Sequence, residues 1–442
     1  MKNKILIVFF LACASIASSQ NMQVLFGMDK LYQSSYLNPA YIPHNRVVVS
    51  LPSFYNNLSI NGPAYSDIFQ KDGGSTVLNV TSLLANLEPS NYFREDMEIQ
   101  TLGLCLSVGP LGVQVYHKTR FNAFIEYPET LPSLIWEGNA QYLGETVDVG
   151  TSLFLHSRSE FGLGASLTLG GLNVGARVKY LNGIGHLHSL RHALSIYTDP
   201  NDYEIVLNSD YMIQSANSLD FNSLNNLSLN FNLGDLNLNE LFTTNNGLAF
   251  DLGIQWRIGK LEVSAAANDI GAIEYDSGVR NYSSSGSFAY DGLDISSVLG
   301  GGQEVTLESM VDTLSQLLVF DEDNTAFEYT LPASYYLMGK FKLTENWDIG
   351  LSYFHERFLD SPVNAISVSA GAGIGSILRV RGAYTIRNKN YTNLGVGVSA
   401  KLAFLELYAL TDNVLVISDP LGARDFNILV GANFAISKKK KK

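Results

Sequence analysis

The stretch FGLGASLTLGGLNVGARVKY, residues 161–180, decides the fold of this chain. In its first half, residues 161–169, apolar residues alternate with glycine, serine and threonine. After Gly170-Gly171, the second half alternates in the same way, with asparagine, glycine, arginine and lysine on its polar face. A period of two indicates a β-strand with two different faces, and a two-glycine connection is typical of a tight hairpin turn. The stretch therefore predicts two antiparallel strands that share one apolar face.

The same alternation recurs along the chain, at residues 248–258, 333–342, 347–355, 378–387, 394–402 and 426–436. The second face of these segments carries glycine, serine and asparagine with scattered charges, which suits the inside of a closed barrel better than a water-exposed surface. Transmembrane strands need about 9–11 residues with this alternation, and a sheet spans a bilayer only when it closes on itself. We therefore predict an all-β fold, a closed antiparallel transmembrane β-barrel of about 14–16 strands.

The composition excludes several other classes of protein. Hydrophobic residues make up 46% of the 442 residues, whereas only 16% are charged, against about 25% in soluble domains. The formal net charge of −13 opposes binding to nucleic acid, because such binding requires a basic surface to neutralise phosphate. After the first dozen residues, no apolar run approaches the roughly 20 residues of a membrane-spanning helix.

The connections between these segments predict an orientation. Outer-membrane barrels place short turns on the periplasmic side and long loops outside. The short connections are at residues 170–171, 259–260, 343–346 and 373–376, and the long ones are at 214–246, 269–326 and 412–424. If the last strand ends at Ile436 on the periplasmic side, the short turns become periplasmic and the long loops external. Residues 131–156 form either two strands or a folded external loop, and residues 217–246 extend a hairpin beyond the membrane. Residues 304–319 have the apolar spacing of an amphipathic helix.

The N-terminus has the pattern of a secretory signal peptide. Lys2 and Lys4 precede the apolar residues 5–12 and the small residues 14–19. A lipoprotein signal ending at Cys13 is the less favoured alternative, and loss of Cys13 with the signal leaves Cys105 without a disulfide partner. We predict export to the outer membrane and the following organisation: signal peptide 1–19, N-terminal plug or hatch 20–45, β-barrel 46–437 and basic tail 438–442.

Three short motifs carry a family resemblance. They are LNPAYIP at residues 37–43, which contains Asn38, Pro39 and Ala40; YTLPASYY at residues 329–336, which contains Leu331 and Pro332; and Thr411-Asp412-Asn413. They resemble an uncharacterised outer-membrane β-barrel family of Bacteroidota, a domain of unknown function. That family is related to the fatty-acid-transporter-like barrels and, more loosely, to type IX secretion and gliding accessory barrels. The resemblance covers essentially the whole mature chain and implies an N-terminal plug inside the barrel. The lysines that follow the last strand depart from the usual end of such barrels.

Four cations are candidates for the barrel lumen. Arg379, Arg381, Arg387 and Lys401 fall on the face opposite the apolar residues of their strands. If the apolar face meets lipid, these cations line the lumen, where they would favour anions or acidic head groups. Alternatively, they pair with lumen carboxylates such as Asp251, Glu262 or Asp348 and hold the interior together. We favour the second interpretation.

The remaining motifs give no catalytic chemistry. His186, His188 and His192 would share one face of a strand, and we interpret them as polar residues near a barrel rim rather than as metal ligands. GAGIG at residues 371–375 is followed by a predicted strand, whereas a nucleotide loop needs a helix there, so we predict a turn. The chain has neither a nucleophile elbow nor an HExxH motif. We predict no enzyme activity, no metal site and no cofactor.

Two functions then compete. One is a plugged conduit for small or hydrophobic molecules, and the other is a scaffold or accessory barrel that binds secreted or surface proteins of the cell envelope. The expected partners are outer-membrane lipid and either a hydrophobic solute or such a protein, but not nucleic acid. We lean towards transport by analogy with the related barrels. The barrel fold further predicts that Leu252→Arg or Leu167→Arg lowers the free energy of unfolding by about 2–4 kcal/mol, whereas the effect of Gly253→Ser on stability is mild.

Overall fold

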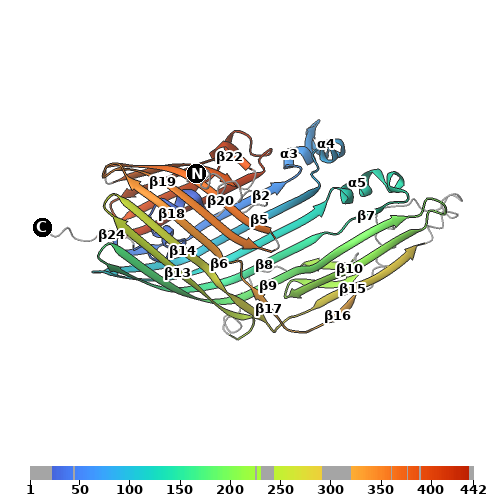
Figure 1. The fold of residues 1–442 in the computed structure, drawn as a ribbon, viewed down its shortest axis with the longest axis horizontal. Helices are drawn as coiled ribbons and strands as arrows, with labels where there is room; N and C mark the ends of the chain where they lie inside the picture. Colours follow the sequence, from blue (N-terminus) through green and yellow to red (C-terminus); the bar gives the residue numbers. More distant parts are fainter. Residues whose placement is uncertain are drawn as a thin grey trace, which may run out of the picture.

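The computed structural model describes residues 22–42, 45–223, 226–229, 243–290, 320–359, 361–375, 377–387 and 390–437. Strands at 14 positions form one closed antiparallel barrel (Figure 1). In order around the barrel they are β1 (Asn45–Ser50) with β2 (Ser53–Asn61), β5 (Ser90–Val108), β6 (Leu111–Pro128), β8 (Ser152–Leu169), β9 (Leu172–Thr198), β13 (Asn246–Ile258), β14 (Leu261–Tyr275), β17 (Phe327–Thr330) with β18 (Ser334–Lys342), β19 (Trp347–Phe358), β20 (Ser361–Ile374), β21 (Leu378–Arg387), β22 (Asn390–Leu402), β23 (Leu405–Thr411) and β24 (Asp425–Ser437).

The barrel closes where the two ends of the chain meet. β1 pairs with β24 on one side and with β5 on the other, and β2 repeats both pairings further along the same strands. No backbone edge is therefore left along this seam, as a sheet surrounded by lipid requires. The prediction of a closed antiparallel barrel is confirmed, with a strand number at the lower end of the predicted range.

The predicted tight turns gather at one end of the barrel, which we call the short-turn end. The chain reverses there at Gly170-Gly171 between β8 and β9, at Gly259 between β13 and β14, and after Ile374 between β20 and β21. Gly170 and Gly259 have positive φ angles of 63° and 59°, which glycine adopts at little cost. β24 also ends at this end, beside the start of β1 (Figure 1).

The opposite end, which we call the long end, carries more secondary structure than the predicted loops. Residues 131–151 form a folded loop, the second of the two predicted alternatives: helix α5 (Thr130–Glu137), the 3-10 turn η2 (Ala140–Tyr142) and β7 (Thr146–Asp148) precede the start of β8. Part of the expected loop 269–326 is strand, because β14 runs on to Tyr275 and β15 (Asn281–Tyr290) and β16 (Asp321–Asp323) follow. The connections from β19 to β20 and from β21 to β22 are short, so the long end carries short connections as well as long ones.

The sheet extends beyond the barrel wall at this end because β9 changes its pairing partner. Residues 172–182 of β9 pair with β13 in the barrel wall, whereas residues 186–198 pair with β10 (Ile205–Ala216), which pairs in turn with β15. These strands project beyond the wall (Figure 1). Polar residues such as Ser283–Ser285 in β15 lack the apolar alternation that marks a lipid-facing strand, which is why the sequence pattern missed them.

Smaller elements complete the long end. They are β11 (Leu219–Ser223) and β12 (Asn226–Leu229), which form a separate hairpin within the region where a hairpin extension was predicted, together with α3 (Tyr65–Ile68), β3 (Phe69–Asp72), β4 (Ser75–Leu78), α4 (Val80–Ala85) and η4 (Val414–Ser418). The predicted amphipathic helix at 304–319, the signal peptide and the basic tail lie outside the described residues.

The outer face of the barrel is an apolar belt. On β13 alone, every second residue from Leu248 to Ile258 is exposed and apolar, and Leu252 at its centre is 55% exposed. Trp256 and Trp347 stand on this face near the short-turn end, whereas Tyr335 and Tyr384 stand on it nearer the long end. Aromatic residues at both edges of an apolar band are typical of a barrel in a lipid bilayer. No helix in the described part of the chain is long and apolar enough to cross a membrane.

The interior is filled by residues 22–42, which we call the inner segment. It contains the single-turn helix α2 (Gln23–Phe26) and the 3-10 helix η1 (Tyr32–Tyr36), and most of its residues are buried. The apolar residues of α2 pack against inward-facing residues of the wall, with the Phe26 and Tyr336 rings stacked at 5.2 Å. The barrel therefore has its apolar core around this segment.

Inward-facing glycines make room for the inner segment. A Cβ atom on Gly253 would lie 2.0 Å from Oδ1 of Asn38, and one on Gly175 would lie 2.2 Å from the carbonyl oxygen of Pro39. The expectation that Gly253→Ser is mild is therefore wrong. Glycine at these positions is required by the close approach of a second chain segment, which an alternation pattern does not reveal.

Candidate functional site

The start of the inner segment is held by one carboxylate of the wall. Both oxygens of Asp412, at the end of β23, accept hydrogen bonds from backbone amides of α2: from Gln23 at 2.8 Å and from Val24 at 2.9 Å. Asp412 is completely buried, and Asn427 Oδ1 accepts a hydrogen bond from its backbone amide at 2.6 Å. Because the first amides of a helix have no partner within the helix, a buried carboxylate satisfies them strongly. Asp412 is thus an anchor for the inner segment.

The end of the inner segment is held by Asn38, which belongs to the stretch LNPAYIP at residues 37–43 that we call the Asn38 motif. Nδ2 of Asn38 donates to the carbonyl oxygens of Ile254 and Ala265, at 3.1 and 3.3 Å, and Oδ1 accepts from the amide of Ala40 at 2.9 Å. One side chain therefore fixes its own turn and attaches it to β13 and β14. Next to it, the Tyr41 hydroxyl lies 2.9 Å from the Ser264 hydroxyl.

The other residues singled out with this motif also lie inside the barrel. Pro39 is the residue whose carbonyl oxygen touches Gly175, and Ala40 is completely buried. Leu331 is buried in a second apolar cluster, and Pro332 lines the cavity described below. The structure thus brings Asn38, Pro39 and Pro332 into the same lumen but gives them separate contacts.

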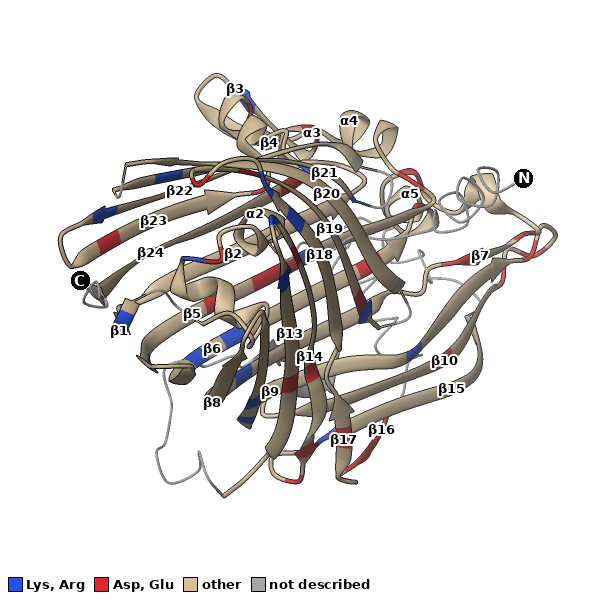
Figure 2. Cartoon of the chain, turned by 60° about the vertical axis from the view of Figure 1, so that its left-hand side comes forward, with Lys and Arg blue, Asp and Glu red and all other residues tan. Residues whose placement is uncertain are grey.

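A network of buried ion pairs crosses the lumen beside the inner segment. Figure 2 shows basic positions on β6 and β9 next to acidic positions on β5, β13 and β14. Arg177 lies 2.7 Å from Asp251 and also donates to the carbonyl oxygen of Ser35 at 2.6 Å, so it joins the network to the inner segment. Lys179 lies 2.7 Å from both Asp251 and Asp269. The sequence pattern predicts Asp251 only as a partner for other cations, because pairs that cross the lumen leave no local pattern.

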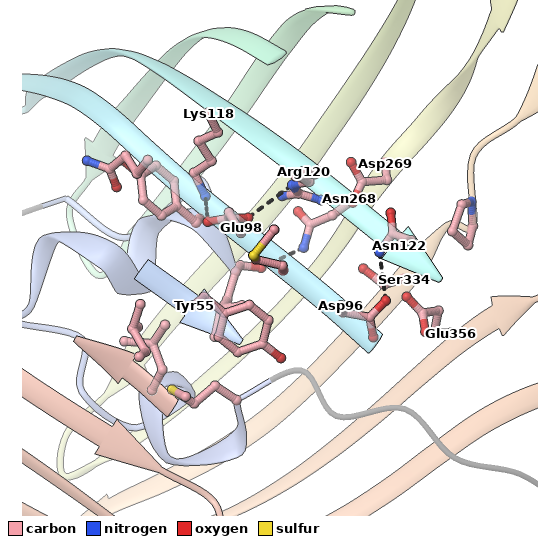
Figure 3. Close-up of a pocket in the computed structure, with 18 of the residues that line it drawn as sticks. Tyr55, Asp96, Glu98, Lys118, Arg120, Asn122, Asn268, Asp269, Ser334 and Glu356 are labelled. Atoms are coloured by element: carbon pink, nitrogen blue, oxygen red, sulfur yellow. Dashed lines mark hydrogen bonds and ion pairs between the residues drawn. The ribbon is translucent and has the colours of Figure 1, made fainter. Parts of the chain in front are cut away.

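The network surrounds a cavity of about 120 Å³ between the inner segment and the long end. Figure 3 shows Lys118, Arg120 and Glu98 pointing toward one another on one side of it, and Asp96, Asn122 and Glu356 on another. Lys118 and Arg120 lie 2.6 and 3.0 Å from Glu98. Met22, Leu25, Phe358 and Leu429 contribute apolar wall. This cavity, which we call the outer cavity, is therefore amphipathic, with a charged side and an apolar side.

A second cavity, of about 200 Å³, lies on the short-turn side of the inner segment, and we call it the short-turn cavity. Gly27, Met28, Asp29, Lys30 and Leu31 form its inner-segment wall, and residues of β13, β18, β19, β20, β21 and β22 with the turn 344–346 form the rest. The two cavities share no lining residue, although both are lined by the inner segment. The inner segment is therefore the partition between them.

The four predicted lumen cations occupy different surroundings. Arg381 is buried and paired with Asp348, and its Nη1 donates to Ser369 at 2.8 Å. Arg387 is buried and paired with Asp425. Arg379 lines the short-turn cavity, and Lys401 donates to Asn45 at 2.5 Å. Two of the four therefore bind carboxylates, as in the favoured interpretation, and these two do not meet each other in one site.

The three predicted histidines do not share a face. β9 carries a bulge at Leu190, where its pairing with β10 shifts by one residue, and this shift turns His192 to the face opposite His186 and His188. His192 is exposed, whereas His186 is buried against His156 of β8 with ring centroids 5.5 Å apart. No cluster of three metal-ligating side chains is found among the described residues.

Several solved structures are similar in fold. They are a FadL homologue from Pseudomonas aeruginosa (10% identity, 95% of this chain and 99% of that chain, TM-score 0.44), the toluene transporter TbuX from Ralstonia pickettii (10% identity, 92% and 94%, TM-score 0.42) and the toluene transporter TodX from Pseudomonas putida (8% identity, 95% and 93%, TM-score 0.38). These low scores describe a loose likeness of barrels and carry no conclusion about what this chain transports or binds.

The sequence of the chain is similar to one family of proteins. No protein with a curated function matches the chain. A family model described as a family of unknown function (DUF5723) matches residues 39–412, from Pro39 to the anchor Asp412, and this range includes every barrel strand before β24. The match covers well over half of the 442 residues, and this chain therefore belongs to the DUF5723 family of unknown function.

Proposed function

We propose that this protein is an outer-membrane conduit for small molecules and that the inner segment keeps it closed in the form described above. The observation that carries this proposal is the pair of interior cavities that the inner segment separates. A barrel that served only as a scaffold needs no space on both sides of a removable partition. Export through residues 1–19 and insertion into the outer membrane belong to the same proposal, and the apolar belt supports the second of these.

The walls of the outer cavity indicate what kind of solute would fit. Arg94, Asp96 and Glu356 form a charged side, with Arg94 2.9 Å from Asp96 and 3.1 Å from Glu356. Phe358 and Leu429 form an apolar side, and the Arg94 guanidinium lies 3.7 Å from the centre of the Phe358 ring. We propose small molecules with an apolar body and at least one polar group, because a purely apolar solute would displace water from the charged side without offering it a hydrogen bond.

The partition is built to be displaced rather than to be part of the wall. Apart from its continuation into β1, the inner segment is joined to the barrel by side-chain contacts at separate points, such as Gln33 with Ser50 and Asn433, and Lys340 with Asp29 at 2.8 Å. No described strand of the barrel pairs with it through a backbone ladder. Its removal therefore leaves every strand pairing of the barrel in place.

Single-channel conductance in a planar bilayer tests the proposal. We expect little current through the mature protein, residues 20–442, and a clear increase after deletion of residues 20–43. Heat-modifiable migration of both proteins on a gel is the control for a folded barrel. Silence from a folded deletion variant would contradict the conduit and would favour the alternative, a scaffold that binds a secreted or surface protein.

A further inference from the structure

The short-turn cavity has an excess of positive charge. Six cationic side chains and three carboxylates line it. Three of the cations already have partners: Lys340 with Asp29 and Glu262, Arg257 with Glu262, and Arg381 with Asp348. The other three are Lys30, Lys342 and Arg379, and none of them makes a hydrogen bond or an ion pair through its side chain with a residue in the described ranges.

These three cations come from separate parts of the chain and face one cavity. Lys30 belongs to the inner segment, Lys342 ends β18, and Arg379 is the second residue of β21. Lys30 is repelled by Arg379, Lys342 and Lys340 and is attracted by Asp29. Asp29 and Glu406 attract Arg379, but neither reaches ion-pair distance. Like charges gathered in a partly enclosed space are unfavourable unless an anion joins them.

The strand register keeps space in front of Arg379. Its neighbour on β20 is Gly373, and its neighbour on β22 is Ser399, which also lines the cavity. A Cβ atom on Gly373 would approach no atom closer than 3.8 Å, an ordinary van der Waals distance, so this position is not tightly packed. Lys342 is exposed at the short-turn end, so the cavity is reached from that side.

We propose that this cavity binds a phosphate group, with Arg379, Lys30 and Lys342 as its cationic ligands. A phosphate monoester carries a charge of about −1.5 to −2 at neutral pH and three acceptor oxygens, which matches three cations that line one cavity better than a single carboxylate does. The planar guanidinium of Arg379 can donate two parallel hydrogen bonds to phosphate oxygens. Because Lys30 lies on the inner segment and Arg379 on the wall, the phosphate bridges the partition to the barrel.

Calorimetric titration of inorganic phosphate into the purified full chain, in phosphate-free detergent solution, tests this site. We expect saturable binding with a dissociation constant of about 1 mM or tighter. Arg379→Gln and Lys30→Gln should each weaken binding at least tenfold, because each removes a ligand. Arg257→Gln is the matched control: it lines the same cavity but is already bound to Glu262 at 3.0 Å, so we expect less than a twofold change.

Competing anions distinguish the sources of the phosphate. Glycerol phosphate that binds more tightly than inorganic phosphate would identify a lipid headgroup or similar monoester, whereas the reverse order would identify the free ion. Acetate that binds more tightly than either would overturn the assignment to phosphate. Absence of saturable binding to the folded protein, or equal binding by all three variants, would overturn the site itself. None of these readouts depends on whether the barrel conducts.

Discussion

At the scale of single residues, the inner segment fits inside the barrel because some inward-facing positions of the wall have no side chain. Gly253 lacks a side chain where Asn38 meets the wall, and a Cβ atom there would also lie 2.9 Å from Cδ of Pro39. We predict that Gly253→Ser forces residues 38 and 39 away from β13 and lowers the free energy of unfolding by about 1–3 kcal/mol, the usual cost of overpacking.

The measurement is denaturant unfolding in detergent, together with protease cleavage within residues 20–45. Gly373→Ser is the matched control, because Gly373 also faces inward but its Cβ would come no closer than 3.8 Å to another atom. Equal stability and equal protection of the two variants would contradict the close packing of the Asn38 motif.

Asp412 allows a second test at this scale. Asp412→Ala leaves the amides of Gln23 and Val24 without their acceptor, and hydrogen bonds to a charged group contribute about 1.5–3 kcal/mol. We predict that the variant releases the start of the inner segment, which limited proteolysis near residue 22 would detect. Asp412→Asn keeps one acceptor oxygen and should be intermediate. Full protection of the alanine variant would show that Asp412 is not the anchor.

At the scale of strands, the position of a residue along the barrel decides how much unfolding free energy is lost when arginine replaces it. Leu252 on β13 and Leu190 on β9 are similarly exposed, at 55% and 46%, but only Leu252 lies within the apolar belt. We predict that Leu252→Arg costs about 2–4 kcal/mol of unfolding free energy in lipid vesicles, the range for a barrel midplane. Leu190→Arg should cost much less, because β9 beyond residue 182 has left the wall. Equal costs would contradict the placement of the belt.

The cost of breaking a charged pair between two strands also depends on where the pair lies. Asp251 is completely buried and binds both Arg177 and Lys179, so Asp251→Asn leaves two buried cations short of a partner. We predict a loss of about 3–5 kcal/mol in unfolding free energy. Asp210→Asn breaks the exposed pair with Arg191 and should cost about 1 kcal/mol or less. Urea titration of both variants checks this, and similar losses would argue against a buried network.

Strands that repeat an apolar period could be predicted from the sequence, whereas strands without such a period could not. The segment 378–387 coincides with β21, because Val380, Tyr384 and Ile386 repeat the apolar period. β15 lacks this period, although Tyr282 and Ser284 are buried, and the sequence therefore predicts a loop there. The bulge at Leu190 likewise leaves no mark in the pattern, and it reversed the expected face of His192. The period of two indicates whether each face of a strand meets an apolar or a polar environment. It does not indicate how the strand pairs with its neighbours.

At the scale of the whole molecule, the inner segment determines what the barrel can do. Its place inside the barrel was implied by a family resemblance, since its own sequence does not alternate. Its contacts join residues far apart in the chain, such as Gln23 and Asp412, and only the closed barrel brings these together. The sequence therefore indicates which faces point inward, but it does not indicate which inward residues meet.

A reversible disulfide between the inner segment and the barrel wall tests whether the inner segment closes the lumen. A Cβ atom on Gly397 would lie 2.5 Å from Cγ1 of Val24, so cysteines at these two positions are close enough to form a disulfide. This disulfide is best placed in the Asp412→Ala variant, where we expect the partition to open. We predict no current through the oxidised protein and a current that appears on reduction, with the Val24→Cys single variant conducting under both conditions. Equal currents before and after reduction of a verified disulfide would contradict the claim that the inner segment closes the lumen.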